Sequence, residues 1–420
     1  MTLDRVATEH RPSGDGRASE EGDLLRTDRE KAGFPELFFD LVFVFALIQM
    51  SHTFAEDFGI MSIVEAAILL LALWWVWIQT TLLTNLLDTR RAAVRLLLFA
   101  LMFCGILLSI ALPEAFHDKG LLFASVYSVM QVGRCLFSLF AHRNADRSVF
   151  LTFLRMTIWL TFSAGFWLAG AMVDPSPRIG LWSVAILIEY AAPAFNYYLP
   201  GLMRGANGET LRVSGEHFAE RTALFVIICL GETILTTGKT AVEHMQTPLT
   251  FFVFCSAFAS TVLMWWLYFH DGQEKMARKA ENTRKPQLVA EVLFVYGHLP
   301  IVMGIVMTAV GEDFSLSHAF DPAGLRETIT IAGGPALFLI GTGGLKFIAG
   351  RGLPLSHCAG AAVIFGLGVS SSLPLFLLQF SATGLLLLVA VWEFLSLKAG
   401  VADRIPLGAK PLSDASEPHP

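Results

Sequence analysis

Long apolar runs dominate this sequence and limit what it can fold into. Between residues 33 and 400, stretches of mostly apolar residues follow one another with only short polar breaks. A helix of about 20 such residues spans the hydrocarbon core of a bilayer. Hydrophobic residues make up 54% of the chain and charged residues 16%, whereas soluble domains average about 45–50% and about 25%. The sequence therefore predicts an all-α integral membrane protein.

The apolar runs number about twelve, and each is predicted to form one transmembrane helix. They cover residues 37–53, 62–84, 92–112, 121–141, 151–173, 179–199, 221–240, 249–270, 288–310, 329–349, 356–380 and 381–397. Only the polar, glycine-bearing region 379–384 separates the last two runs, so a count of ten or eleven stays open. The polar segments 1–32 and 401–420 are predicted to be disordered tails.

The loop charges predict the orientation of the helices, because Lys and Arg accumulate in cytoplasmic loops. With the N-terminus inside, fifteen basic residues fall in inner loops and four in outer loops. The inner set is Arg90, Arg91, Arg95, Arg143, Arg147, Arg204, Arg212, Arg221, Lys275, Arg278, Lys279, Arg284, Lys285, Lys346 and Arg351; the outer set is Lys119, Arg178, Lys239 and Arg326. Both tails are therefore predicted to be cytoplasmic.

Three sequence features recur in the same order in the halves 33–200 and 201–400. Glu36-Leu-Phe-Phe-Asp-Leu-Val-Phe-Val opens the first run, and Glu220-Arg-Thr-Ala-Leu-Phe-Val-Ile-Ile opens the seventh. Trp74-Trp-Val-Trp77 corresponds to Trp265-Trp-Leu-Tyr268, and Leu112-Pro-Glu-Ala-Phe116 to Val310-Gly-Glu-Asp-Phe314. An offset of six helices gives both halves the same orientation. The pattern predicts two parallel six-helix repeats, an arrangement that many transporters use, with the substrate site where the repeats meet.

Ionisable residues inside the predicted helices are the candidate functional residues, because a charge at the bilayer centre costs about 2.5–3.5 kcal/mol. Glu232 lies about ten residues into the seventh run, near the expected midplane. Glu189 has a similar position in the sixth run. Glu36 and Asp40 are four residues apart on one face of the first helix, near its inner end.

Each candidate also has a structural interpretation. Arg134 or Arg155 could pair with Glu189 or Asp40 and fix the positions of the helices. Acids in a first turn, such as Glu36, also favour the helix dipole.

Gln49, His217 and His298 are secondary candidates. His298 is predicted at mid-membrane in the ninth run, and no His or Cys lies at ligand spacing from it, so an interior hydrogen bond fits it better than a metal site. We predict no metal site and no cofactor.

Three of these elements together resemble the bacterial low temperature requirement protein A (LtrA) family. They are Glu36-Leu-Phe-Phe-Asp40-Leu-Val-Phe-Val, His217-Phe-Ala-Glu220-Arg221 running into Leu224-Phe-Val-Ile-Ile-Cys-Leu-Gly231-Glu232, and Trp265-Trp266-Leu-Tyr-Phe269. The similarity covers the chain from about Gly33 to Leu397. It implies a multi-pass bacterial inner-membrane protein associated with growth in the cold, and it implies no particular substrate.

The leading functional hypothesis is a transporter or channel for protons, other cations or a small solute. Glu232 would bind the proton or cation, Glu220 and Arg221 would form its cytoplasmic gate, and Asp40 and Glu36 would act in the same way in the first half.

One alternative is a structural or sensory protein that responds to the bilayer in the cold. A less favoured one is a lipid-modifying enzyme, since the sequence has no HExxH, GxSxG or P-loop motif. Membrane lipid is an expected partner and a homo-oligomer is compatible with the sequence. The net charge of −6 does not point to nucleic acid.

Overall fold

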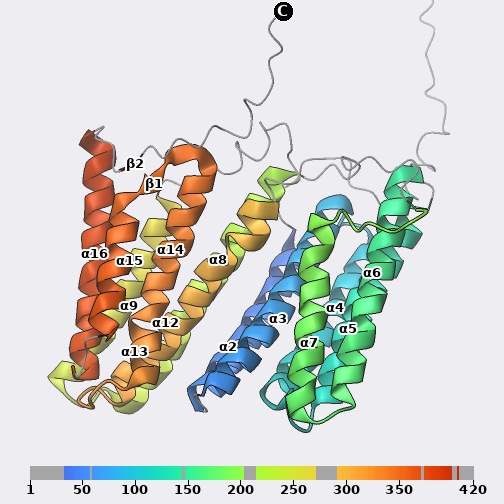
Figure 1. Cartoon of the computed structure of the whole chain (residues 1–420). Coiled ribbons are helices and arrows are strands. Elements are labelled where there is room, and N and C mark those ends of the chain that lie inside the picture. The colour runs from blue at the N-terminus through green and yellow to red at the C-terminus, as the bar shows by residue number, and fades with distance from the viewer. Residues whose placement is uncertain are drawn as a thin grey trace, which may run out of the picture.

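The chain folds into long helices that stand side by side in two groups, with α2 and α8 where the groups meet (Figure 1). The computed structural model describes residues 33–56, 59–143, 147–202, 214–270, 291–369, 373–399 and 404–405. These residues are mostly helical, as predicted from the apolar runs. The predicted disordered tails, 1–32 and 401–420, lie outside the described residues except for Arg404–Ile405.

The helices follow the order of the predicted runs. The first half contains α2 (Phe34–Glu56), α3 (Ile60–Leu86), α4 (Ala92–Ala111), η1 (Leu112–Glu114), α5 (Gly120–Ala141), α6 (Arg147–Ala171) and α7 (Pro175–Ala194). The second half contains α8 (Gly215–His244), α9 (Pro248–Phe269), η2 (Glu291–Tyr296), α12 (Leu299–Ser317), α13 (Leu325–Ile331), α14 (Gly333–Lys346), η3 (Phe347–Arg351), α15 (Leu355–Val369) and α16 (Leu375–Ala399). Two short strands, β1 (Leu353–Pro354) and β2 (Arg404–Ile405), pair antiparallel.

Eight helical segments of the described residues are long and apolar enough to cross a membrane. They are Ile60–Leu86, Ala92–Glu114, Gly120–Ala141, Arg147–Ala171, Pro248–Phe269, Val292–Ser317, Leu325–Ala349 and Leu375–Lys398. The helix α15 is apolar but shorter. The count of twelve spanning helices stays a prediction.

The predicted boundary between the last two runs is wrong. The helix α16 runs without interruption from Leu375 to Ala399, so the region 379–384 lies inside it. One polar residue of this region contacts another helix: Thr383 Oγ1 lies 3.0 Å from Ser256 Oγ of α9. Ser381 donates to Leu377 of its own helix. The chain turns just before α16, where Pro374 bridges to Pro322.

The helices of each half pack against one another in the same order. In the first half α2 contacts α3 and α4, the contacts continue through α4–α5, α5–α6 and α6–α7, and α7 returns to α3. In the second half α8 contacts α9 and α12, the contacts continue through α12–α14, α14–α15 and α15–α16, and α16 returns to α9. The first helices of the two halves, α2 and α8, contact each other.

The outer surface of the helices is apolar and the interior contains polar residues. Large apolar side chains that are more than half exposed include Leu96, Phe103, Val129, Phe162, Leu187, Leu235 and Leu388. By contrast Glu36, Asp40, Arg221 and Glu312 are fully buried. This distribution is the one expected when lipid surrounds the helices, since charged residues then face the interior of the bundle.

Glycines allow α12 and α14 to pack closely. A Cβ atom on Gly304 would lie 2.6 Å from the backbone nitrogen of Phe338, and one on Gly334 would lie 2.7 Å from that of Thr308. Small residues at such crossings let helix backbones approach each other in membranes. The contact fixes one face of α12, while another face packs against α8.

Candidate functional site

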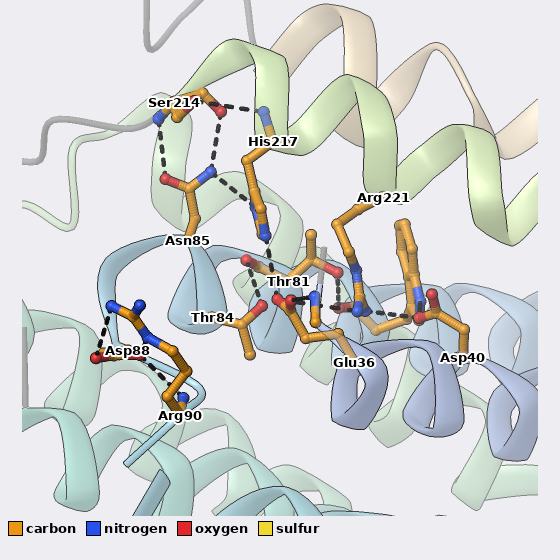
Figure 2. A network of polar contacts seen from close by, with 12 residues as sticks. Glu36, Asp40, Thr81, Thr84, Asn85, Asp88, Arg90, Ser214, His217 and Arg221 are labelled. Carbon is orange, nitrogen blue, oxygen red and sulfur yellow. Dashed lines mark hydrogen bonds and ion pairs between the residues drawn. The ribbon is translucent and has the colours of Figure 1, made fainter. Parts of the chain in front are cut away.

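A fully buried charged cluster joins α2 to α8 (Figure 2). Arg221 Nη2 of α8 donates to Asp40 Oδ1 of α2 at 2.6 Å, and Arg221 Nη1 lies 3.9 Å from Glu36 Oε1. Trp77 of α3 donates a second hydrogen bond to Asp40 Oδ1 at 2.7 Å. Buried charges need such partners, because an unpaired charge in the interior is strongly unfavourable. We call Glu36, Asp40 and Arg221 the α2–α8 cluster.

His217 extends the α2–α8 cluster towards the first turn of α8. Its Nε2 lies 3.1 Å from Glu36 Oε1, and its Nδ1 lies 3.2 Å from Asn85 Nδ2 at the end of α3. The Asn85 side chain also accepts from the backbone nitrogen of Ser214 and donates to its carbonyl oxygen, both at 2.9 Å. The end of α3 thereby positions the start of α8 beside the start of α2.

Local sequence explains why α2 and α8 begin at this point. The backbone nitrogen of Gly33 donates to Glu36 Oε2 at 2.6 Å, so Glu36 caps its own helix. An acid in the first turn also interacts favourably with the helix dipole. Ser214 caps α8, accepting a hydrogen bond from the backbone nitrogen of His217 at 3.3 Å.

The structure arranges these candidates differently from the sequence analysis. We expected Glu220 with Arg221 as one pair and Glu36 with Asp40 as a separate group in the first half. Instead Arg221 contacts both acids of α2, and Glu220 is only partly buried. Adjacent residues of a helix point about 100° apart, so Glu220 and Arg221 face different surroundings.

Asp88, in the turn after α3, belongs to a separate and more exposed ion pair. Arg90 Nε lies 3.0 Å from Asp88 Oδ1, and Arg91 Nε lies 3.7 Å from Asp88 Oδ2. Partial burial opposes ionisation of this carboxyl, but hydrogen bonds from Arg90 outweigh it and lower the pKa of Asp88 below its usual range. Asp88 lies near the α2–α8 cluster (Figure 2) but has its own partners, which makes it a suitable control position.

A small cavity lies between α2, α8 and α12, next to the α2–α8 cluster. It is lined by Val44, Leu47 and Ile48 of α2, by Cys229, Glu232, Thr233 and Thr236 of α8, and by Ile305, Val306 and Ala309 of α12. Its volume is about 20 Å³, which is enough for about one water molecule. Val44 follows Asp40 by one helical turn, so the cavity begins one turn beyond the Asp40–Arg221 ion pair.

Glu232 supplies the one carboxylate among the residues lining the cavity. It is partly buried, and Thr236 Oγ1 lies 3.5 Å from its Oε1. The helix α8 begins before the predicted run, and Glu232 lies close to the middle of its 30 residues. Gln49 directly follows Ile48 of the cavity lining and is partly buried on α2.

Glu189 lies away from the α2–α8 cluster, inside the first half. It is buried and accepts four hydrogen bonds, two on each oxygen, from Tyr127 (2.5 Å), Gln131 (3.3 Å), Ser163 (2.7 Å) and Trp167 (3.0 Å). Arg134 donates to Gln131 and so belongs to the same network. Arg155, by contrast, donates to Leu151 and Thr152 of its own helix.

The second half contains a buried ion pair that the sequence analysis missed. Lys346 Nζ of α14 lies 2.6 Å from Glu393 Oε1 of α16 and 3.1 Å from His357 Nε2 of α15. The sequence predicts Lys346 in an inner loop, whereas the structure places it at the end of α14, which continues into η3. The sequence does contain a sign of this ion pair, because Glu393 is an acid inside the last apolar run and a buried acid needs a basic partner.

His298 has the interior hydrogen bonds that the sequence predicts. Its Nε2 lies 2.8 Å from the Tyr268 hydroxyl and its Nδ1 lies 2.8 Å from the carbonyl oxygen of Leu293. His298 lies between η2 and the first residue of α12, inside the apolar segment Val292–Ser317, and its depth in the membrane stays a prediction. Within the described part of the chain, no group of three or more His, Cys, Asp or Glu side chains could hold a metal ion.

Glu312 is a fully buried acid that was not among the candidates. The ninth run was predicted to end at residue 310, whereas α12 continues to Ser317 and carries Glu312 into the interior. Thr237 of α8 donates to Glu312 Oε2 at 2.8 Å. Glu114, its counterpart in the repeated motif, is exposed in η1.

The spanning helices, the apolar outer surface and the polar interior define a multi-pass helical membrane protein. Residues 31–391 match the family model described as Bacterial low temperature requirement A protein (LtrA), so the chain belongs to that family. The match confirms the resemblance found in the sequence motifs. The chain is also 53% identical over 376 residues to "Uncharacterized protein RA0937" of Rhizobium meliloti (strain 1021), covering 89% of this chain and 91% of that protein.

Proposed function

We propose that this protein is a transporter or channel for protons, other cations or a small solute, with its pathway between α2, α8 and α12. The observation that supports this most is the cavity between the two halves, which Glu232 lines with a carboxylate. A partly buried acid on a membrane helix is expensive to maintain and is a typical feature of ion pathways. Glu232 would bind the transported proton or cation, and Thr236 would assist it.

The two halves would be parallel six-helix repeats. The shared order of helix packing supports this. So does the placement of buried charges: the fourth and last helices of the first half carry Arg134 and Glu189, and the corresponding helices of the second half carry Lys346 and Glu393. Parallel repeats generally place their substrate site where the two repeats meet.

The Asp40–Arg221 ion pair would close the pathway on one side of the cavity. Both side chains are fully buried, and the cavity begins one turn beyond them on α2. Glu36 and His217 lie on the far side of this pair, where α2 and α8 begin. Opening the gate would require α8 to move relative to α2, so that Arg221 separates from Asp40.

The distribution of basic residues supports an orientation with this gate on the cytoplasmic side. It would place both termini in the cytoplasm and the protein in the bacterial inner membrane. Such a transporter or channel would carry out no chemical reaction and would need no cofactor. Membrane lipid is the expected surrounding, and assembly into a homo-oligomer is compatible with the proposal.

The test is proton and potassium flux into liposomes that contain the purified protein, followed with ion-sensitive dyes. The parent chain should conduct at least one of these ions. Glu232→Gln should lower the flux to the rate of protein-free liposomes while the protein still inserts and unfolds at a similar temperature. Glu243→Gln is the matched control, because Glu243 is an exposed acid on the same helix.

Undiminished ion flux in Glu232→Gln would refute the role given to this carboxylate. If neither ion moves under any gradient, uptake of radiolabelled organic solutes by the same liposomes is the next measurement. Absence of all flux would leave the structural or sensory hypothesis, in which Glu232 contributes only to helix packing.

A further inference from the structure

The buried acids of the described residues differ in how their charge is compensated. Glu36 and Asp40 face Arg221; Asp88 faces Arg90 and Arg91; Glu393 faces Lys346; and Glu189 accepts four hydrogen bonds. Glu312 has a different environment. Thr237 donates to its Oε2 at 2.8 Å, and the Ser260 hydroxyl of α9 also lies beside the carboxyl group. Its Oε1 is fully buried and makes no hydrogen bond of ordinary length among the described residues.

The charged groups on the elements around α12 lie elsewhere. Lys239 is exposed on α8. Arg326 of α13 lies over the ring of Phe314, 4.5 Å from its centre, and forms an ion pair with Glu327. Lys346 of α14 is paired with Glu393 of α16, and the acids of α2 are paired with Arg221. Glu312 therefore has no cation beside it in the described part of the chain.

These surroundings favour a protonated carboxyl group. An ionised carboxylate in an apolar interior requires a counter-charge or several hydrogen-bond donors, and otherwise takes up a proton. A metal ion would need more oxygen ligands than the hydroxyls of Thr237 and Ser260 and one carboxyl group provide. The ligand that fits this site is a single proton.

The position of Glu312 connects it to the cavity beside Glu232. Ala309 lines the cavity, and Glu312 follows it by about one turn on α12. Thr233 of α8 also lines the cavity, and Thr237 follows it by one turn. One helical turn rises about 5.4 Å, so the Thr237–Glu312 hydrogen bond lies directly beyond the cavity, on the side away from the Asp40–Arg221 pair.

A row of polar residues continues from there to the end of α8. Glu232, Thr236, Thr240 and His244 are spaced four residues apart and therefore share one face of the helix. Thr240 donates to Asp313 of α12, the residue next to Glu312. His244 Nδ1 lies 3.2 Å from the carbonyl oxygen of Thr240. Polar groups thus extend from the cavity to the C-terminal end of α8.

We infer that Glu312, hydrogen-bonded to Thr237, is a proton-binding site that exchanges protons between the cavity at Glu232 and the polar residues around Asp313. This inference rests on the proposed function and makes the proton the transported species. When Glu312 releases its proton, the O–H bond of the carboxyl breaks and the proton passes to water or to the Asp313 carboxylate. Glu312 then stays ionised until a proton arrives from the Glu232 side.

The test combines infrared spectroscopy with proton flux on the purified full-length protein in liposomes. At neutral pH the parent should show the carbonyl stretch of a protonated carboxyl group. Glu312→Gln should remove this band and lower proton flux to the rate of protein-free liposomes. Glu312→Asp should keep a band at a shifted frequency and part of the flux. Glu243→Gln, with its exposed acid, should leave both signals unchanged.

An unchanged band in Glu312→Gln, or proton flux equal to that of the parent, would overturn the inference. If the Gln variant does not fold, Glu312→Asp decides, because a band that does not shift belongs to another group. Failure of the proposed function looks different: the parent then carries no protons. That result would refute proton exchange through Glu312. The infrared carbonyl band would still show whether Glu312 holds a proton.

Discussion

Arg221 of α8 and Asp40 of α2 form a fully buried ion pair of 2.6 Å between positions 181 residues apart in the chain. The base that compensates Asp40 lies on α8, and the acid that compensates Arg221 lies on α2. Glu36, on the same face of α2, adds a second acid to the one arginine. The charges of α2 and α8 are therefore compensated only when the two halves of the protein are packed together.

Removal of Arg221 should destabilise the protein strongly. Arg221→Gln leaves Asp40 buried without its base and Glu36 with His217 alone, and breaking a buried ion pair in this way costs about 3–5 kcal/mol. The variant should therefore unfold in detergent at a clearly lower temperature than the parent. The double variant Arg221→Gln with Asp40→Asn should recover much of the loss, because it removes one of the uncompensated charges.

Asp88→Asn is the control for this pair. It also removes an acid that contacts arginine, but on the more exposed turn after α3, where an ion pair contributes about 0–1 kcal/mol. A small shift for Asp88→Asn beside a large one for Arg221→Gln would support the assignment. Equal shifts in the two variants would contradict it.

Glu189 should prove to be a structural residue. Glu189→Leu leaves the donors of Tyr127 and Trp167 without an acceptor inside the first half, and each buried unsatisfied donor costs about 1–3 kcal/mol. Gln131 and Ser163 each keep another acceptor, the Tyr127 hydroxyl and the carbonyl oxygen of Ala185. Glu189→Gln retains one acceptor oxygen and should destabilise less. Flux per folded molecule in the Gln variant should match the parent, measured in the same liposomes. Loss of flux with unchanged thermal stability would instead make Glu189 a second functional acid.

The contact between α12 and α14 should tolerate no added side chain. In Gly304→Ala the new Cβ would lie 2.6 Å from a backbone atom of Phe338, so the helices must move apart. We expect a loss of about 1–3 kcal/mol, the usual cost of overpacking, seen as a lower unfolding temperature in detergent.

Gly238→Ala on α8 is the matched control for this substitution, since a Cβ atom there would have no atom within 4 Å apart from the neighbouring backbone of its own helix. Alanine in a helix interior is favoured over glycine by about 0.5–1 kcal/mol, so this variant should be as stable as the parent or more so. A neutral Gly304→Ala would show that α12 and α14 pack less closely than described.

The length and composition of the apolar runs were sufficient to predict the helical membrane class, because the thickness of a bilayer fixes how long a spanning helix must be. Helix ends were harder to predict. The ninth run is predicted to end at residue 310, where hydropathy falls, but α12 continues through Glu312 to Ser317, and Thr237 of α8 supplies a hydroxyl that partners the acid in the interior. Hydropathy marks the apolar part of a helix and cannot detect such a partner.

The candidate site was predictable residue by residue but not as an arrangement. Asp40 and Glu232 are predicted because each is ionisable and lies inside an apolar run, and Glu36 and Arg221 because they are charged residues where such runs begin. Spacing along one helix shows which residues share a face. Spacing cannot show which neighbouring helix that face contacts. The contact between Arg221 and the acids of α2 is therefore known only from the packing of α2 against α8.

The long separation between Asp40 and Arg221 has a consequence for how the protein is made. At about 5–20 residues per second, a ribosome adds the intervening 181 residues in roughly 10–40 s. During that time α2 has left the ribosome with two acids and without their base. Insertion of the first helix is therefore less favourable before α8 has been made than after it, since only α8 supplies the base for these acids.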